Sequence, residues 1–159
     1  MNKAEFVYVT YIRTTIDRLW DALTRPEFTR QYWFGFESRS TWAKGAKWEL
    51  VAPDGRVFDS GEIVEVDRPR RIVIAWRHQM HEEMRAEGPS RATFDLETIG
   101  DTVKLTIRHS SDVDGSKLIG AVSQGWPHIL ASLKSLLETG KPLAETTRWP
   151  AEAGCVSSR

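Results

Sequence analysis

The sequence has only one cysteine, Cys155, which excludes a disulfide within the chain and a metal site built on several thiolates. It also has no net charge, because 22 lysines and arginines balance 22 aspartates and glutamates. Nucleic-acid-binding proteins usually carry a basic excess, so this balance argues against that class. No apolar run has the length of a membrane-spanning helix, and no signal peptide opens the chain. We therefore expect a cytoplasmic protein that does not insert into membranes.

Several catalytic signatures are absent as well. The chain contains neither a GxxxxGK[ST] phosphate loop nor a GxGxxG dinucleotide motif, and it lacks the GxSxG turn of hydrolases. We therefore expect no cofactor. His78 and His81 form an H-x-x-H pair, but this pair straddles the end of a predicted strand and a polar loop at 81–89. Such histidines are more often solvated than bound to a metal, so we expect no metal site.

Tryptophan, by contrast, is abundant, with seven residues, and one long amphipathic stretch organises the chain. Residues 117–139 place their apolar side chains on one face of a helix, with Gly140 as its end and Pro127 as a predicted kink. Period-two alternation predicts strands over 5–13, 36–42, 46–51, 57–66, 72–80, 91–98 and 102–109, and two short helices are predicted over 16–24 and 26–32. The pattern predicts an α+β fold in which a curved antiparallel sheet of about seven strands wraps round the C-terminal helix.

Three local motifs carry a resemblance to a known family. They are Leu19-Trp20-Asp21-Ala22-Leu23-Thr24 with Pro26-Glu27, the run from Gly61 to Pro69 leading into Ile74-Ala75-Trp76, and Gly125-Trp126-Pro127. In this order they resemble the START-like (SRPBCC) superfamily with its helix-grip fold, in the branch named for the activator of a heat-shock chaperone's ATPase. The resemblance covers a domain at 1–140 and leaves 141–159 as a C-terminal tail.

The resemblance implies a binder of a small hydrophobic or amphipathic, lipid-like molecule, since the superfamily includes polyketide cyclases, plant allergens and lipid-transfer domains. By family name it also implies a role in the stress response with a chaperone partner. That partner is doubtful, because the named activators carry an additional N-terminal domain. Two further interpretations stay open: an enzyme of the cyclase or hydratase type, and a homodimer.

Strand alternation and the helix stripe predict which side chains face a cavity between sheet and helix. The expected apolar walls are Trp48, Phe58, Trp76, Phe94, Val122, Trp126 and Leu130, although each of these residues can equally fill the core. Glu62, His78 and His109 are the candidate polar contacts. Glu62 and His109 are also the candidates for an acid or base, since a carboxyl group in an apolar pocket has a raised pKa. Glu62 faces solvent instead if its strand register slips by one residue.

Overall fold

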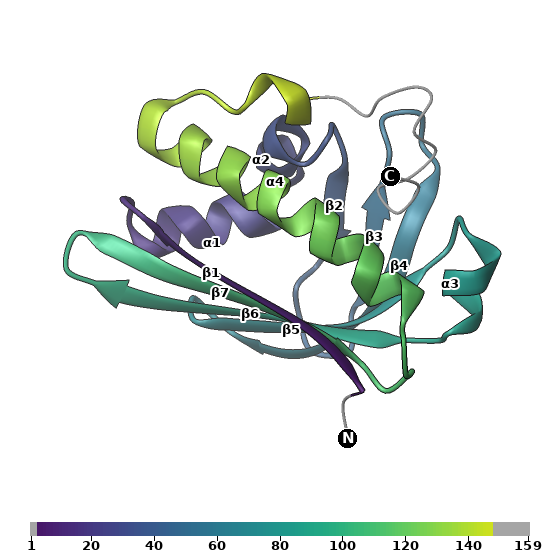
Figure 1. The fold of residues 1–159 in the computed structure, drawn as a ribbon. Coiled ribbons are helices and arrows are strands. Elements are labelled where there is room, and N and C mark those ends of the chain that lie inside the picture. Colours follow the sequence, from purple (N-terminus) through teal and green to yellow (C-terminus); the bar gives the residue numbers. More distant parts are fainter. Residues whose placement is uncertain (1–2, 148–159) are drawn as a thin grey trace.

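The chain folds into one seven-stranded antiparallel sheet with helices over its inner face (Figure 1). The computed structural model describes residues 3–147. The elements are β1 (Ala4–Ile12), α1 (Ile16–Thr24), α2 (Pro26–Tyr32), β2 (Glu37–Ser40), β3 (Lys47–Val51), β4 (Val57–Asp67), β5 (Arg71–His78), α3 (Glu82–Ala86), β6 (Ser90–Ile99), β7 (Thr102–Ser111), α4 (Lys117–Thr139) and a short 3-10 helix (Ala144–Thr146). The strand order is β1-β7-β6-β5-β4-β3-β2, which confirms the predicted α+β architecture.

The first two helices follow from local signals. Thr15 caps α1 by accepting a hydrogen bond from the backbone N–H of Arg18, at 3.2 Å. Arg25 is extended because proline follows it, and Pro26 then occupies the first turn of α2, where a missing N–H costs nothing. Both helices therefore have the bounds that the sequence predicts.

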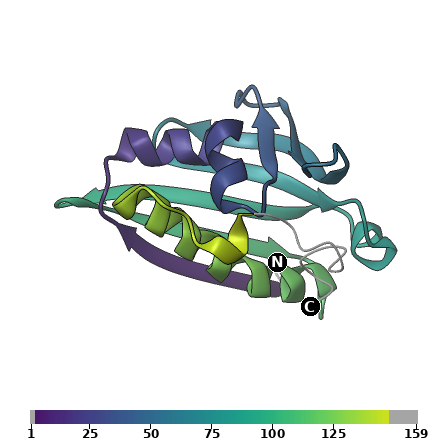
Figure 2. The ribbon, with the colours of Figure 1, turned by 90° about the horizontal axis from the view of Figure 1, so that it is seen from above.

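Helix α4 crosses the inner face of the sheet alongside α1 and α2 (Figures 1 and 2). Ser116 caps its N-terminus, and Gly140 ends it in the left-handed conformation with φ of 85°. The helix continues through Pro127 as one element of 23 residues. Most of the predicted apolar stripe is buried against the sheet and the other helices, whereas His128 is exposed. Among the described residues, no helix is long and apolar enough to cross a membrane.

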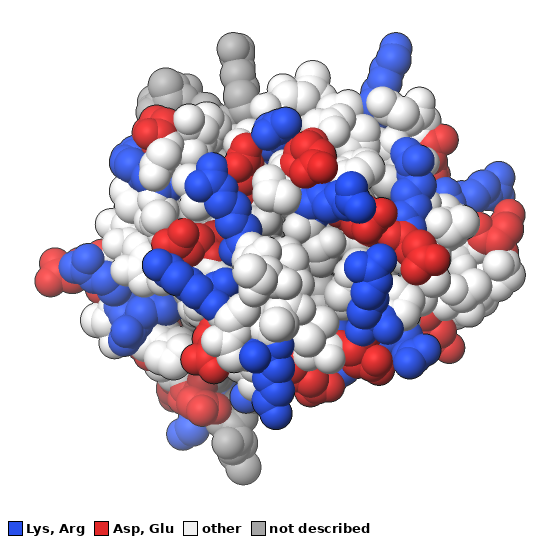
Figure 3. All heavy atoms as spheres, turned by 180° about the vertical axis from the view of Figure 1, so that it is seen from behind, with Lys and Arg blue, Asp and Glu red and all other residues white. Residues whose placement is uncertain are grey.

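Within residues 3–147, all helices lie over the inner face of the sheet and none covers the outer face (Figure 1). Alternate residues of β1 face this side, and Val7, Val9 and Tyr11 are 42%, 44% and 47% exposed. They lie on the solvent side of an antiparallel sheet, which needs only one buried face. Over the side of the molecule seen in Figure 3, basic and acidic side chains are interspersed.

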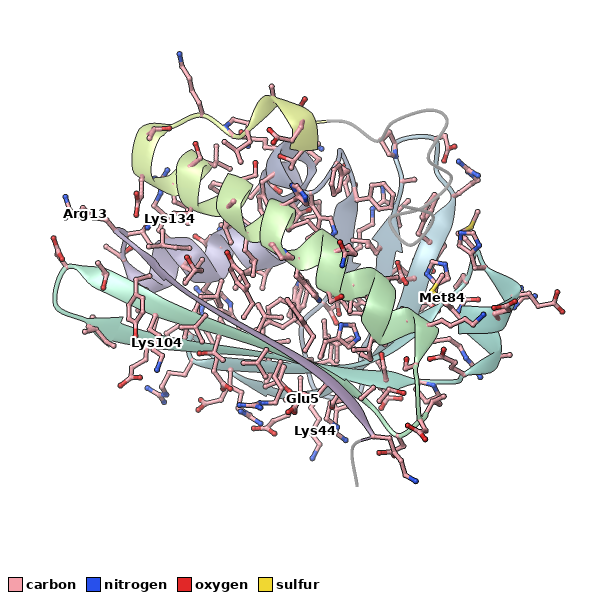
Figure 4. All side chains as sticks on the ribbon, in the orientation of Figure 1. Glu5, Arg13, Lys44, Met84, Lys104 and Lys134 are labelled. Carbon is pink, nitrogen blue, oxygen red and sulfur yellow. The ribbon has the colours of Figure 1, made fainter. Side chains whose placement is uncertain are left out.

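The free edge of β1 is partly covered by side chains of α4. Lys134 donates a hydrogen bond to the carbonyl oxygen of Tyr11, and the backbone N–H of Arg13 donates to Oε2 of Glu138 at 2.8 Å (Figure 4). These contacts satisfy polar groups that an edge strand otherwise leaves open.

Two short helices lie in segments where the sequence predicts no regular structure. The predicted loop at 81–89 contains the helix α3. The first residues of the predicted tail pack on the domain, because the Leu143 N–H and the Thr146 hydroxyl both donate to Oγ of Ser132. Cys155 lies outside the described residues.

Candidate functional site

A small cavity lies at one end of the inner face, between the sheet, the α2–β2 connection, α3 and the N-terminal half of α4. Its volume is about 60 Å³. Ligand pockets usually measure about 300–1,000 Å³, so side chains occupy most of the expected container. The walls are aromatic and aliphatic, and two polar side chains interrupt them, Asp59 and His78.

The predicted ligand contacts divide into three groups. Phe58, Trp76, His78, Val122 and Trp126 line the cavity. The others that are buried, Trp48, Phe94, His109 and Leu130, belong to the core beside it. Glu62 is exposed on the opposite face of the sheet.

The inward orientation predicted for Glu62 is therefore wrong, and the reason is a β-bulge. In the pairing of β3 with β4, Leu50 pairs with Asp59 and Val51 pairs with Val57, so Phe58 is an extra residue. Phe58 and Asp59 both end up inside, and the alternation beyond them shifts by one. Asp59 rather than Glu62 becomes the buried carboxylate.

Gly61 offers a signal that locates this register. It pairs with Trp48 on one side and Trp76 on the other, and both indoles are buried. A Cβ atom on residue 61 would lie only 1.7 Å from the carbonyl oxygen of Ala75. A glycine between two tryptophan-bearing strands thus marks the inner face, which puts Glu62 outside.

The tryptophan side chains pack on one another at the cavity. The ring centroids of Trp33 and Trp126 lie 5.3 Å apart, those of Trp76 and Trp126 5.8 Å, and those of Trp33 and Trp76 6.3 Å. Trp48 reinforces the cluster from the core side, 4.4 Å from Trp76. Such offset and tilted pairs are favourable geometries, so the rings form a rigid wall.

Asp59 is the polar centre of the cavity. Its Oδ1 accepts hydrogen bonds from Nε1 of Trp76 at 3.0 Å and from Nδ1 of His78 at 2.9 Å. The side chains of Asp59 and His78 are only 9% and 7% exposed. A buried carboxylate beside an imidazole can accept protons, donate them through the imidazole, or hold a polar group of a ligand.

His109, the other predicted acid or base, does not line the cavity but belongs to a hydrogen-bonded chain between two tryptophans that do. Its Nδ1 accepts from Nε1 of Trp126 at 3.3 Å, and its Nε2 lies 2.8 Å from Oγ of Ser90. Since the Ser90 hydroxyl donates to the carbonyl oxygen of Trp76, Nε2 of His109 carries the proton and donates to Ser90. Burial lowers the pKa of His109 to about 3, so the imidazole is neutral near pH 7. This arrangement fits a structural link between sheet and helix and does not support an acid or base role.

The two histidines of the H-x-x-H pair stack on each other, with ring centroids 5.7 Å apart. Among the residues that the structure describes, no group of three or more His, Cys, Asp or Glu side chains is placed to hold a metal ion. His81 instead borders a polar hollow of about 730 Å³ between α3 and the start of α4.

Met84, which Figure 4 labels, and Ala121 line both this hollow and the cavity. Two glutamates, Glu83 in α3 and Glu87 just after it, hold this segment to the start of α4. Glu83 pairs with the ammonium group of Lys117, and the Glu87 carboxylate accepts from the backbone N–H of Lys117 at 2.8 Å and from the Ser116 hydroxyl at 2.6 Å. The α3 segment thus forms the outer wall of the cavity.

Comparison with known proteins agrees with this architecture. The family model described as activator of Hsp90 ATPase homolog 1-like protein matches residues 13–138, and the chain belongs to this family. The resemblance noted in the sequence is thereby confirmed. A search of curated proteins found no match.

Solved structures show the same fold at low identity. The Aha1 dimer from Colwellia psychrerythraea is 17% identical with a TM-score of 0.71, over 87% of this chain and 98% of that one. An HSP90 activator from Plasmodium falciparum is 19% identical with a TM-score of 0.68, over 84% and 95%. DynU16, from the dynemicin biosynthetic locus, is 20% identical with a TM-score of 0.73, over 91% and 49%.

Proposed function

We propose that the protein binds a small hydrophobic or amphipathic molecule in the cavity between the sheet and α4. The observation that carries this proposal is an apolar, largely aromatic cavity with a single buried polar pair, Asp59 and His78, inside it. Binding sites for small molecules combine apolar walls with a few placed polar groups in this way. The similarity to DynU16, from a biosynthetic locus, is compatible with a small-molecule ligand.

The ligand enlarges the cavity by moving α3. A volume of about 60 Å³ admits only part of a molecule. Met84 on α3 stands between the cavity and the polar hollow, and α3 is a helix of only five residues. When Met84 is displaced, the cavity and the hollow join, so a ligand larger than the cavity extends from the tryptophans into the hollow.

Native mass spectrometry of the purified protein, followed by organic extraction, tests this function. A stoichiometric small molecule is the expected result. A matched pair of variants locates it: Ala121→Leu narrows the passage between cavity and hollow, whereas Ala131→Leu makes the same change at an exposed site on the same helix. We expect loss of the ligand only in the first variant. Equal retention by both variants would contradict the proposed site.

The Asp59–His78 pair favours one alternative, an acid–base enzyme of the cyclase or hydratase type. The imidazole lies in an apolar cavity with its Nδ1 oriented by a carboxylate, an arrangement that suits proton transfer. If the ligand that co-purifies is converted on incubation, His78→Gln abolishes the conversion and Glu62→Gln leaves it unchanged. Recovery of the ligand unaltered by the active protein supports binding without catalysis.

A chaperone-associated role is the alternative that the names of the relatives suggest. A pull-down with the purified chain as bait tests it, with a variant of the exposed β1 residue Val9 and the variant Ala121→Leu as controls for surface and cavity. Specific recovery of a heat-shock chaperone that survives Ala121→Leu would favour this role over ligand binding.

A further inference from the structure

The carboxylate of Asp59 is nearly buried in the lining of an aromatic cavity. Both of its hydrogen bonds, from Trp76 and from His78, end on Oδ1. Among the described residues, no hydrogen bond reaches Oδ2 of Asp59. The cavity thus contains a carboxylate oxygen that has acceptor capacity for a ligand.

The charge of Asp59 has little compensation from the protein. Among the ion pairs of the described residues, His78 is its one partner, and no lysine or arginine contacts it. Lys117, the basic residue at the hollow, already pairs with Glu83. A carboxylate that is almost buried requires a positive or strongly donating partner, because the low dielectric penalises an isolated charge.

The aromatic walls favour the same kind of partner. Trp33, Trp76 and Trp126 stand within 6.3 Å of one another by ring centroids, and the pair Phe36 and Phe58 lies beside them with centroids 4.8 Å apart. The faces of aromatic rings carry negative potential and attract ammonium groups, most strongly where water is excluded.

We propose that the cavity recognises the protonated or quaternary amine of an amphipathic ligand, with Asp59 as the counter-charge and the tryptophans as a surrounding cage. The inference rests on the proposed ligand binding and names the chemical class of ligand. The apolar remainder of the molecule extends past Met84, and the hollow beyond adds the acidic side chains Glu82 and Glu83.

Three probes with one hexyl chain and different head groups test the charge preference: hexyltrimethylammonium, hexan-1-ol and hexanoate. Binding is followed by NMR of the indole N–H groups. The N–H of Trp76 donates a hydrogen bond to Asp59, so its signal reports on a ligand at that carboxylate. We expect the cation to bind about tenfold or more tighter than the alcohol, because cation–π attraction adds to the charge pairing. Hexanoate should bind most weakly.

Asp59→Asn then isolates the carboxylate, because asparagine keeps the shape and removes the charge. The affinity for the cation should fall to that for the alcohol, and the affinity for the alcohol should stay within about twofold. Glu62→Gln is the matched control, since it removes an exposed carboxylate of the same strand on the opposite face of the sheet and should leave the ranking of probes unchanged.

The order in which the wild-type protein binds the three probes tests the cation preference even if Asp59→Asn does not fold. Equal binding of cation and alcohol, or preferred binding of hexanoate, would overturn the cation preference and leave apolar ligand binding intact. The second of these results would show that the cavity favours a negatively charged head group. Failure of all three probes to shift any indole signal, together with an empty protein in native mass spectrometry, would overturn the proposed function itself.

Discussion

Acid is expected to destabilise this protein through His109, whose side chain is completely buried. Burial lowers the pKa of His109 from 6.5 to about 3 in the folded protein, whereas the unfolded chain exposes the imidazole to water and restores its ordinary pKa. As the pH falls below about 6.5, the unfolded chain binds a proton that the folded protein does not bind, and the stability drops by up to about 1.4 kcal/mol per pH unit. This loss is absent above pH 6.5 and stops growing near pH 3.

The magnitude is large enough to measure. At about pH 5 the loss from this one group amounts to about 2 kcal/mol, against a total stability of about 5–15 kcal/mol for a typical domain. The variant His109→Gln removes the titration. A glutamine amide can still donate to Ser90 but leaves the indole N–H of Trp126 without its acceptor, which costs about 1–3 kcal/mol near pH 7.

The wild-type protein is therefore expected to be more stable than His109→Gln near neutrality, and this advantage should shrink as the pH falls. Urea unfolding at several pH values between about 7 and 4 gives both curves. His128→Gln is the control, because it makes the same change at an exposed histidine on α4. If the curves of wild type and His109→Gln run parallel across this range, the buried neutral imidazole is refuted.

Two further predictions concern the sheet. Gly61→Ala should lower the free energy of unfolding by at least about 3 kcal/mol or prevent folding, because the added Cβ would lie 1.7 Å from the Ala75 carbonyl oxygen. Gly120→Ala should instead stabilise α4 by up to about 1 kcal/mol, because the Cβ added there meets no neighbouring atom within 4 Å. Thermal unfolding of both variants checks this, and similar midpoints would contradict the register of β4. The sequence leaves a homodimer open. If one forms through the exposed apolar residues of β1, Val9→Lys should weaken it in sedimentation velocity without lowering the unfolding midpoint of the monomer in calorimetry. A wild-type chain that sediments as a monomer would contradict the dimer.

Local signals in the sequence were sufficient for the elements and their order. Pro26 separates α1 from α2, Gly140 ends α4, and the alternation in β6 and β7 needs no tertiary context. The long helix and the run of antiparallel hairpins then leave few ways to bury one sheet face.

The candidate site depended on features that are not local. The extra residue Phe58 exists only because β3 and β4 pair in a particular register, so strand alternation alone chose Glu62 and missed Asp59. The exposure of Val9 likewise depends on the whole fold: no helix of the described residues covers that face of β1, and no residue of the strand encodes this. Whether Trp33 and Trp126 enclose space or fill it is decided by the distance between their rings, and this distance follows from the whole fold.

The hydrogen-bonded chain from Trp126 through His109 and Ser90 to the Trp76 carbonyl has a kinetic consequence. It fastens α4 to the sheet at the cavity, so in the proposed binding α4 stays in place while α3 moves. In the proposed entry past α3, the ligand breaks the exposed ion pair between Glu83 and Lys117, and salt weakens the attraction within this pair. Ionic strength should therefore raise the association rate through this gate, the opposite of its usual effect when opposite charges steer a ligand into a protein.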